Sequence, residues 1–102
     1  MSEINQLKSE IRAFADARDW EVFHTPKNLS MAVAGEAGEL VSEFQWLTAD
    51  ESRKENLDAK KFTDIKMEIA DVALYLFRLA DVLEVDLAEV MRAKMEINEK
   101  RF

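Results

Sequence analysis

The sequence has no cysteine, one histidine, one proline and two glycines among its 102 residues. Without cysteine, disulfides, thiolate zinc sites and cysteine nucleophiles are excluded. The scarcity of glycine and proline leaves little material for tight turns, which favours a few long helices over a many-stranded sheet. Neither a signal peptide nor an apolar run long enough to span a bilayer is visible, so we expect a cytoplasmic protein with no membrane partner.

Basic residues are also in short supply, and the net charge is -7. A protein that binds a nucleic-acid backbone needs clustered Lys and Arg to neutralise the phosphates, so we do not expect nucleic acid as a partner. Hydrophobic residues make up 48% of the chain and charged residues 34%, which indicates a folded protein and not a disordered one. The length fits one domain over residues 1–102, and a domain this small gains core by forming a homo-oligomer.

Apolar residues at helical spacing predict four main helices. We expect them over about residues 2–18, 28 or 29–47, 58 or 63–83, and 87–102. Pro26 disfavours helix at Thr25, which predicts a loop over residues 18–28. A capping-box pattern at 48–51 predicts a short helix to about Asn56, and the polar stretch 53–64 is expected to be an exposed, mobile linker with helical turns at most. The predicted fold is an all-α four-helix bundle.

Acidic residues are paired on two of these helices. Glu36 and Glu39 are three residues apart and so share one helix face, and Glu68 and Asp71 repeat the spacing on the long helix. If the two faces meet, the four carboxylates repel one another unless a cation lies between them. A single such pair is ordinarily just a solvated face, and the sequence alone leaves both interpretations open.

The residue types narrow the choice of metal. Di-iron helical bundles use Glu-x-x-His pairs, whereas the only histidine here, His24, lies in the predicted loop. An oxygen-only site favours Mg²⁺, or Mn²⁺ as a substitute, and with it chemistry on phosphate groups. Glu43 lies on the same helix face as Glu36 and Glu39, and it is a candidate outer-shell or additional metal ligand.

Two further clusters each allow two interpretations. Trp20, Phe23 and His24 precede the second helix and Trp46 ends it, so they form either an aromatic plug at a helix junction or a stacking pocket for a nucleobase.

The second cluster lies on the last helix, where three side chains share one face: Lys94, Asn98 and Arg101. They are either a solvated basic stripe near a helix C-terminus or a set of contacts to phosphate oxygens.

Taken in order, four stretches resemble the MazG-like nucleoside triphosphate pyrophosphohydrolases, and among them the small dCTP-pyrophosphatase branch. The acidic signature is GEAGEL followed by EIADV, and the likeness extends to RDWEVFHTPKNL, EFQW and KMEINEKR. The resemblance covers nearly the whole chain. It implies an all-α, Mg²⁺-dependent enzyme that cleaves a nucleoside triphosphate between the α and β phosphates, and that assembles as a homodimer or a homotetramer built from dimers.

Residue by residue, the resemblance also assigns roles. It makes Glu36, Glu39, Glu68 and Asp71 the metal-binding and catalytic carboxylates. It places Trp20, His24, Trp46 and Tyr75 near the base and sugar. Contacts to phosphate or sugar, including contacts from a neighbouring subunit, would come from Lys94, Asn98 and Arg101.

The resulting hypothesis is a housecleaning enzyme that converts a dNTP, dCTP or a modified dCTP first, to dNMP and pyrophosphate. One rival keeps this chemistry but changes the nucleotide, for example to dUTP, an oxidised nucleotide or a phosphoribosyl-ATP. The other rival is a non-enzymatic helical module whose acidic face recruits a basic partner protein.

Overall fold

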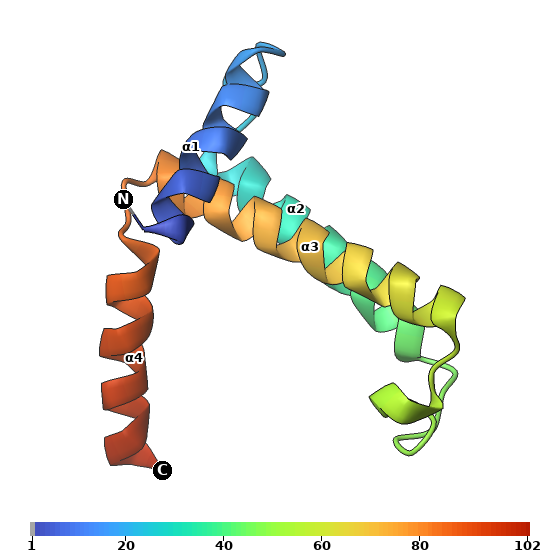
Figure 1. Cartoon of the computed structure of the whole chain (residues 1–102). Coiled ribbons are helices and arrows are strands. Elements are labelled where there is room, and N and C mark those ends of the chain that lie inside the picture. The colour runs from blue at the N-terminus through green and yellow to red at the C-terminus, as the bar shows by residue number, and fades with distance from the viewer. Residues whose placement is uncertain (1) are drawn as a thin grey trace.

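The computed structural model describes residues 2–102, and within them every regular element is a helix. The elements are α1 (Glu3–Asp16), α2 (Pro26–Phe44), a 3-10 turn η1 (Lys54–Asn56), α3 (Ala59–Val82) and α4 (Leu87–Arg101) (Figure 1). The predicted all-α fold with four main helices is confirmed. No helix in the described part of the chain is both long and apolar enough to cross a membrane.

Each main helix begins at a side-chain cap, which explains where it starts. The residue before the helix accepts a hydrogen bond from a backbone N–H of the first turn, and the four capping residues are Ser2, Thr25, Asp58 and Asp86. Such caps satisfy N–H groups that have no partner inside the helix. Helix α2 starts at Pro26, slightly earlier than predicted, because proline is well suited to the first helical position.

The connection between α2 and α3 differs from the prediction. The capping box is present, since the backbone N–H groups of Thr48 and Glu51 each bond the other residue's side chain, at 2.8 and 3.1 Å. It closes a turn and does not start an α-helix, and only Lys54–Asn56 is 3-10 helical. Of the two predicted starts of the long helix, the structure agrees with the earlier one, because Asp58 caps α3 and the helix begins at Ala59. The predicted linker over 53–64 is therefore wrong for residues 59–64.

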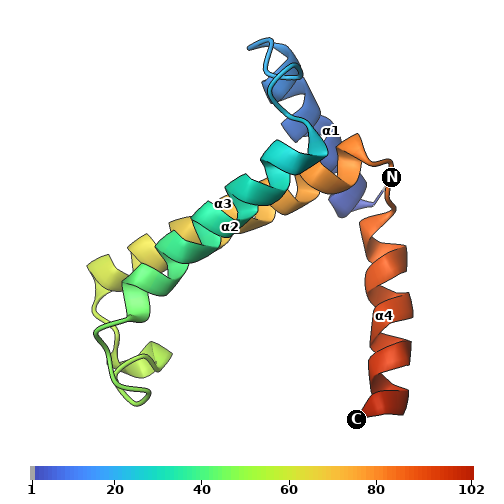
Figure 2. The same cartoon turned by 180° about the vertical axis from the view of Figure 1, so that it is seen from behind.

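The helices of one chain do not surround a single core. Helices α2 and α3 lie antiparallel and side by side, and α1 crosses the C-terminal half of α3 (Figures 1 and 2). Helix α4 leaves the end of α3 and projects away from the other three. The radius of gyration is 16.1 Å, against about 13 Å for a compact domain of 100 residues.

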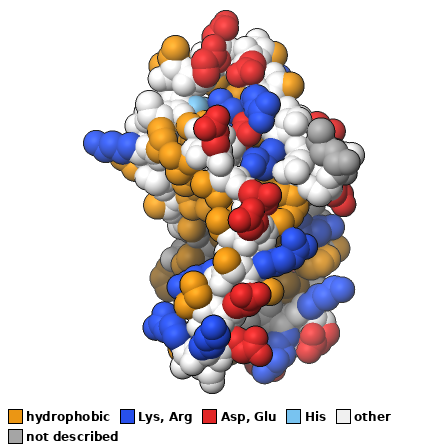
Figure 3. Space-filling view, turned by 90° about the vertical axis from the view of Figure 1, so that its left-hand side faces the viewer, with side chains coloured by type: hydrophobic (Ala, Val, Ile, Leu, Met, Phe, Trp, Pro, Cys, Tyr) orange, Lys and Arg blue, Asp and Glu red, His pale blue; other side chains and the backbone are white. Residues whose placement is uncertain are grey.

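Little apolar surface is buried within residues 2–102. The buried apolar residues are Ala15, Leu29, Ile65 and Ala80. Large apolar side chains are exposed on every main helix, among them Phe14, Met31, Met67, Leu83 and Met95. Figure 3 shows apolar side chains at the surface on the side of the molecule that includes α4. Exposed apolar faces of this kind are suited to contacts between proteins.

A charged network fastens α1 to α3. Arg12 makes two hydrogen bonds to the Asp81 carboxylate, at 2.8 and 2.6 Å, and buried Arg78 lies 3.6 Å from the same carboxylate. The Arg12 hydrogen bond holds the pKa of Asp81 below its ordinary value. Lys8 on α1 adds a bond to the carbonyl of Val85, at 2.8 Å. Because Asp81 is shared by two arginines, it is the central member of the network.

Substituting Asp81→Asn is expected to lower the free energy of unfolding by about 2 kcal/mol, because it leaves Arg78 buried without a carboxylate. Denaturant unfolding followed by circular dichroism checks this. The depressed pKa also predicts a pH effect, since this stabilisation is present above pH ~4 and is lost as pH falls through the folded pKa of Asp81. The parent should therefore lose more stability on acidification than Asp81→Asn, and equal losses would contradict the account.

Candidate active site

Packing of α2 against α3 brings the two acidic motifs together. Carboxylate oxygens of Glu36, Glu68 and Asp71 lie within 4.8 Å of one another, and all three residues are half-buried. Glu36 comes from α2, while Glu68 and Asp71 share one face of α3 because they are three residues apart. The two helices thus bring three of the four paired acids into one cluster.

Glu68 is the member of the cluster that most needs a cation. Its Oε2 atom is buried and has no hydrogen-bond partner. Burial, followed by the charges of Asp71 and Glu36 and then of two further acids, raises the pKa of Glu68 above its ordinary value. A divalent cation with oxygen ligands would supply the missing partner and cancel the repulsion, so these residues fit such an ion.

The other two acids of α2 lie differently. Glu39 is exposed and stands outside the three-carboxylate cluster, although it is close enough for its charge to raise the Glu68 pKa. Glu43 is paired with Lys61, whose Nζ donates to the Glu43 carboxylate and backbone carbonyl at 3.1 Å each. In this structure Glu43 therefore has a partner of its own beside the cluster.

An apolar pocket adjoins the acidic cluster. It has a volume of about 390 Å³ and lies between α1, α3 and the loop before α2. Trp20, His24 and Tyr75 line it together with apolar residues of α1, and Asp71 lies on its wall. The Trp20 ring is 5.8 Å from His24 and 5.7 Å from Phe14. Carboxylates at the rim of an aromatic pocket suit a ligand with a flat apolar part and an anionic part that carries a cation.

The chain is similar in sequence and in fold to known pyrophosphatases. No protein-family model matches the chain. The chain is 39% identical to human dCTP pyrophosphatase 1 and 38% identical to the mouse protein of the same name, over all 102 residues. It spans only 58% of the length of each. A crystal structure of a pyrophosphatase from Archaeoglobus fulgidus is 36% identical, with a TM-score of 0.90 over the whole of this chain and 94% of that one. The chain belongs to the MazG-like pyrophosphatase family.

Four of the predicted site residues lie apart from the pocket in this MazG-like chain. Trp46 follows the end of α2, is 87% exposed and does not line the pocket. Lys94, Asn98 and Arg101 lie on α4, which projects away from α2 and α3 (Figure 1). Within one chain, these four side chains do not meet the acidic cluster, and their roles stay predictions.

Sequence reasoning missed part of the pocket of this pyrophosphatase homologue. Leu7, Ile11 and Phe14 form its wall on α1, and Arg78 reaches it from α3. The apolar stripe of α1 was visible in the sequence, but an apolar stripe does not reveal which surface it covers. Arg78 carried a clearer signal, because it is the only basic residue in the apolar stretch IADVALYLFRLADVL.

The raised pKa of Glu68 predicts how the metal-free MazG-like protein responds to pH. A carboxyl group whose folded pKa is raised stabilises the fold below its unfolded pKa, and loses that contribution as pH rises through the folded value. In EDTA, the contribution of the Glu68 carboxyl group to the melting temperature should therefore fall as pH rises from about 4.5 towards neutrality. Glu68→Gln should lack this contribution, so its melting temperature should exceed that of the parent at pH 7 and not at pH 4. The same difference at both pH values would contradict the assignment.

Proposed function

We propose that this protein is a metal-dependent nucleotide pyrophosphatase that hydrolyses a deoxynucleoside triphosphate, dCTP first, to dCMP and pyrophosphate. The observation that carries the proposal is that the carboxylate cluster and the aromatic pocket share Asp71. A nucleotide has the two parts that this arrangement needs, a flat base and an anionic phosphate chain. The names of the relatives, dCTP pyrophosphatase 1 and pyrophosphatase, support both the reaction and the base.

Roles for the acidic residues follow from their positions. Glu36, Glu68 and Asp71 would hold Mg²⁺, or Mn²⁺ in its place, and Glu39 would complete the acidic set from the next turn of α2. The bound ion would neutralise phosphate oxygens and lower the pKa of a water ligand. Asp71 lies on the wall of the pocket, so it would hold the phosphate chain next to the base site.

Aromatic residues would hold the rest of the nucleotide. Trp20, His24 and Tyr75 line the pocket and would enclose the base and sugar, where an aromatic ring can stack on a base. The surrounding apolar wall excludes water from that part of the substrate. Hydrolysis then adds one water molecule across the α–β phosphoanhydride, and pyrophosphate leaves.

The protein would assemble as a homodimer or as a homotetramer built from dimers. The exposed apolar faces and the isolated α4 helix support this assembly. In such an assembly, the phosphates of a nucleotide bound to a neighbouring subunit would be contacted by Lys94, Asn98 and Arg101. Trp46 would be covered by another subunit. Residues 1–102 would form one domain of a cytoplasmic protein that removes unwanted nucleotides from the nucleotide pool.

A substrate panel tests the proposal. Purified protein is incubated with dCTP, 5-methyl-dCTP, dUTP, dTTP and dATP, in Mg²⁺ and in EDTA, and pyrophosphate release is measured. We expect turnover in Mg²⁺ only, with the highest kcat/KM for the cytosine nucleotides. A preference for dUTP would overturn the base assignment. No turnover, together with a melting temperature that Mg²⁺ leaves unchanged, would favour the helical interaction module.

A further inference from the structure

The only histidine of the chain accepts a hydrogen bond from a buried arginine. Arg78 Nε donates to His24 Nδ1 at 3.0 Å, and Arg78 is only 6% exposed. An arginine N–H is always a donor, because the guanidinium does not lose its proton in proteins. The accepting Nδ1 atom must then carry a lone pair. In neutral His24 the ring proton is therefore on Nε2.

The network behind Arg78 fixes its position. Its guanidinium lies 3.6 Å from Asp81, and Arg12 of α1 grips the same carboxylate with two hydrogen bonds. Asp81 is three residues beyond Arg78 on α3, so the two side chains share a face of that helix. Arg78 is thus held from one side by Asp81 and presents Nε to His24 on the other.

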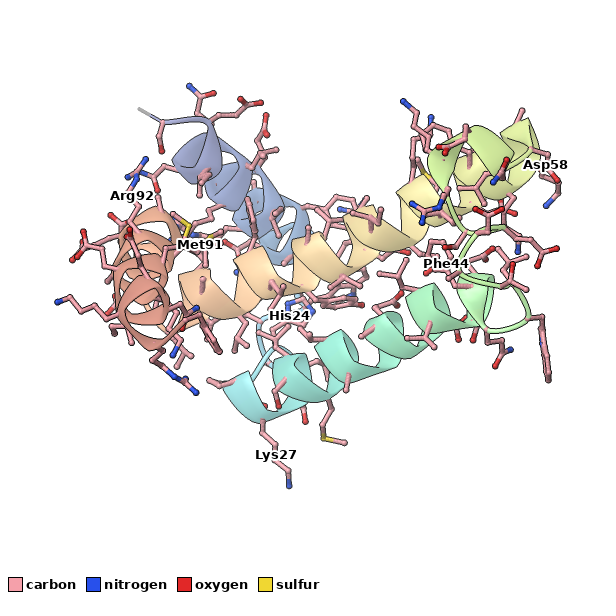
Figure 4. The ribbon with its side chains drawn as sticks, turned by 90° about the horizontal axis from the view of Figure 1, so that it is seen from below. His24, Lys27, Phe44, Asp58, Met91 and Arg92 are labelled. Carbon is pink, nitrogen blue, oxygen red and sulfur yellow. The ribbon has the colours of Figure 1, made fainter. Side chains whose placement is uncertain are left out.

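His24 has few polar neighbours in the pocket. It lies between α3 and the start of α2 (Figure 4), and most residues that line the cavity are apolar. In such a pocket, a small number of placed polar groups fix the orientation of a ligand. A donor that is buried without an acceptor is costly, so an N–H there discriminates between ligand atoms.

The charge state of His24 agrees with this geometry. Burial, and next the positive charge of Arg78, lower the pKa of His24 below its ordinary value, while Glu21 opposes them. The ring is therefore neutral at physiological pH, with one donor and one acceptor nitrogen.

We propose that Arg78 is a positioning residue that holds His24 in the Nε2–H tautomer, so that His24 donates a hydrogen bond to an acceptor atom on the edge of the nucleotide base. This inference rests on the proposed function, and it deepens it by naming what the base must offer. Cytosine presents two adjacent acceptors, O2 and N3, whereas N3 of uracil or thymine carries a hydrogen. A fixed donor placed opposite N3 thus favours cytosine nucleotides, because uracil and thymine offer acceptors only at O2 and O4.

Nitrogen NMR of the parent 102-residue chain tests the tautomer directly, since its one histidine gives one set of ring signals. Two-bond ¹H–¹⁵N correlations at neutral pH should show a protonated Nε2 and an unprotonated Nδ1. In Arg78→Met the ring should become a mixture of tautomers, and Arg78→Lys should restore part of the preference. A parent protein with its proton on Nδ1 would overturn the inference, whether or not the protein hydrolyses any nucleotide.

Kinetics test the base contact. For dCTP, Arg78→Met should raise KM about tenfold and leave kcat within about twofold, because the lost contact is to the base and not to the reacting phosphate. His24→Phe should have a similar effect, and the double variant should be no worse than either single one, since Arg78 acts through His24. Additive effects, or an unchanged KM in Arg78→Met, would overturn the inference while the hydrolysis itself stood.

Arg12→Met is the matched control. It removes an arginine from the same network but does not touch His24. It should reduce thermal stability and leave the His24 tautomer and the KM for dCTP as in the parent. If Arg12→Met raised KM as much as Arg78→Met, the effect would belong to the α1–α3 junction as a whole, and the specific role of Arg78 would be refuted.

Discussion

Substituting Glu36→Gln is expected to reduce kcat/KM for nucleotide hydrolysis by about 10³-fold, which corresponds to about 4 kcal/mol of transition-state stabilisation. Glutamine keeps the shape of the side chain but removes one of the three charges that meet across α2 and α3. The remaining two carboxylates would bind a divalent cation more weakly. Pyrophosphate release over a range of Mg²⁺ concentrations measures the loss, and added Mg²⁺ should recover part of it.

The same substitution should leave the fold intact. Removing a charge beside Glu68 relieves repulsion, so the metal-free variant should melt no lower than the parent. Glu43→Gln is the matched control, because Glu43 lies on the same helix but is paired with Lys61. Its activity should stay within about tenfold of the parent. Glu36→Gln activity in that same range would contradict the metal-ligand role.

Substituting Met95→Glu on α4 is expected to break the proposed homo-oligomer and to abolish most of the proposed activity. Met95 is 63% exposed and Met91 lies one turn before it, so together they form an apolar stripe on a helix that has few contacts within its own chain. A charge inside an apolar interface is strongly destabilising. If α4 also delivers Lys94, Asn98 and Arg101 to a neighbouring site, dissociation would remove contacts to the phosphates as well.

Light scattering and pyrophosphate release, measured on the same samples, check this prediction. Lys100→Glu is the control, since it also adds negative charge to α4 but lies on roughly the opposite side of the helix from Met91. It should leave both the mass and the activity close to those of the parent. A parent protein that is already monomeric at assay concentration and fully active would contradict the account.

The acidic cluster was predictable because it depends on local geometry. The three-residue spacing puts each pair on one helix face whatever the tertiary structure, and only the contact between the two helices had to be inferred. Polar capping residues likewise mark helix starts, as Asp86 does for α4. Pro26 carries two signals, because a proline disfavours helix at the residue before it and is also well suited to the first helical position, where it opens α2.

Contacts between distant segments were not predictable in the same way. The Arg78–His24 bond joins residues 54 positions apart, and no local pattern reports it. Trp46 is another example. An aromatic residue after an acidic helix suggests a pocket wall, but the structure leaves Trp46 exposed. The position of α4 depends on which apolar faces pack together. The apolar pattern of the sequence does not specify whether α4 packs on helices of its own chain or on those of a second copy.

Phosphorus NMR of dCTP incubated with the pure protein and Mg²⁺ shows which phosphoanhydride bond, if any, is hydrolysed. We expect the triphosphate signals to give way to those of dCMP and pyrophosphate in a one-to-one ratio, and EDTA or Glu36→Gln to suppress the conversion. The appearance of dCDP and orthophosphate, or dCTP that persists unchanged in Mg²⁺, would contradict the proposed function.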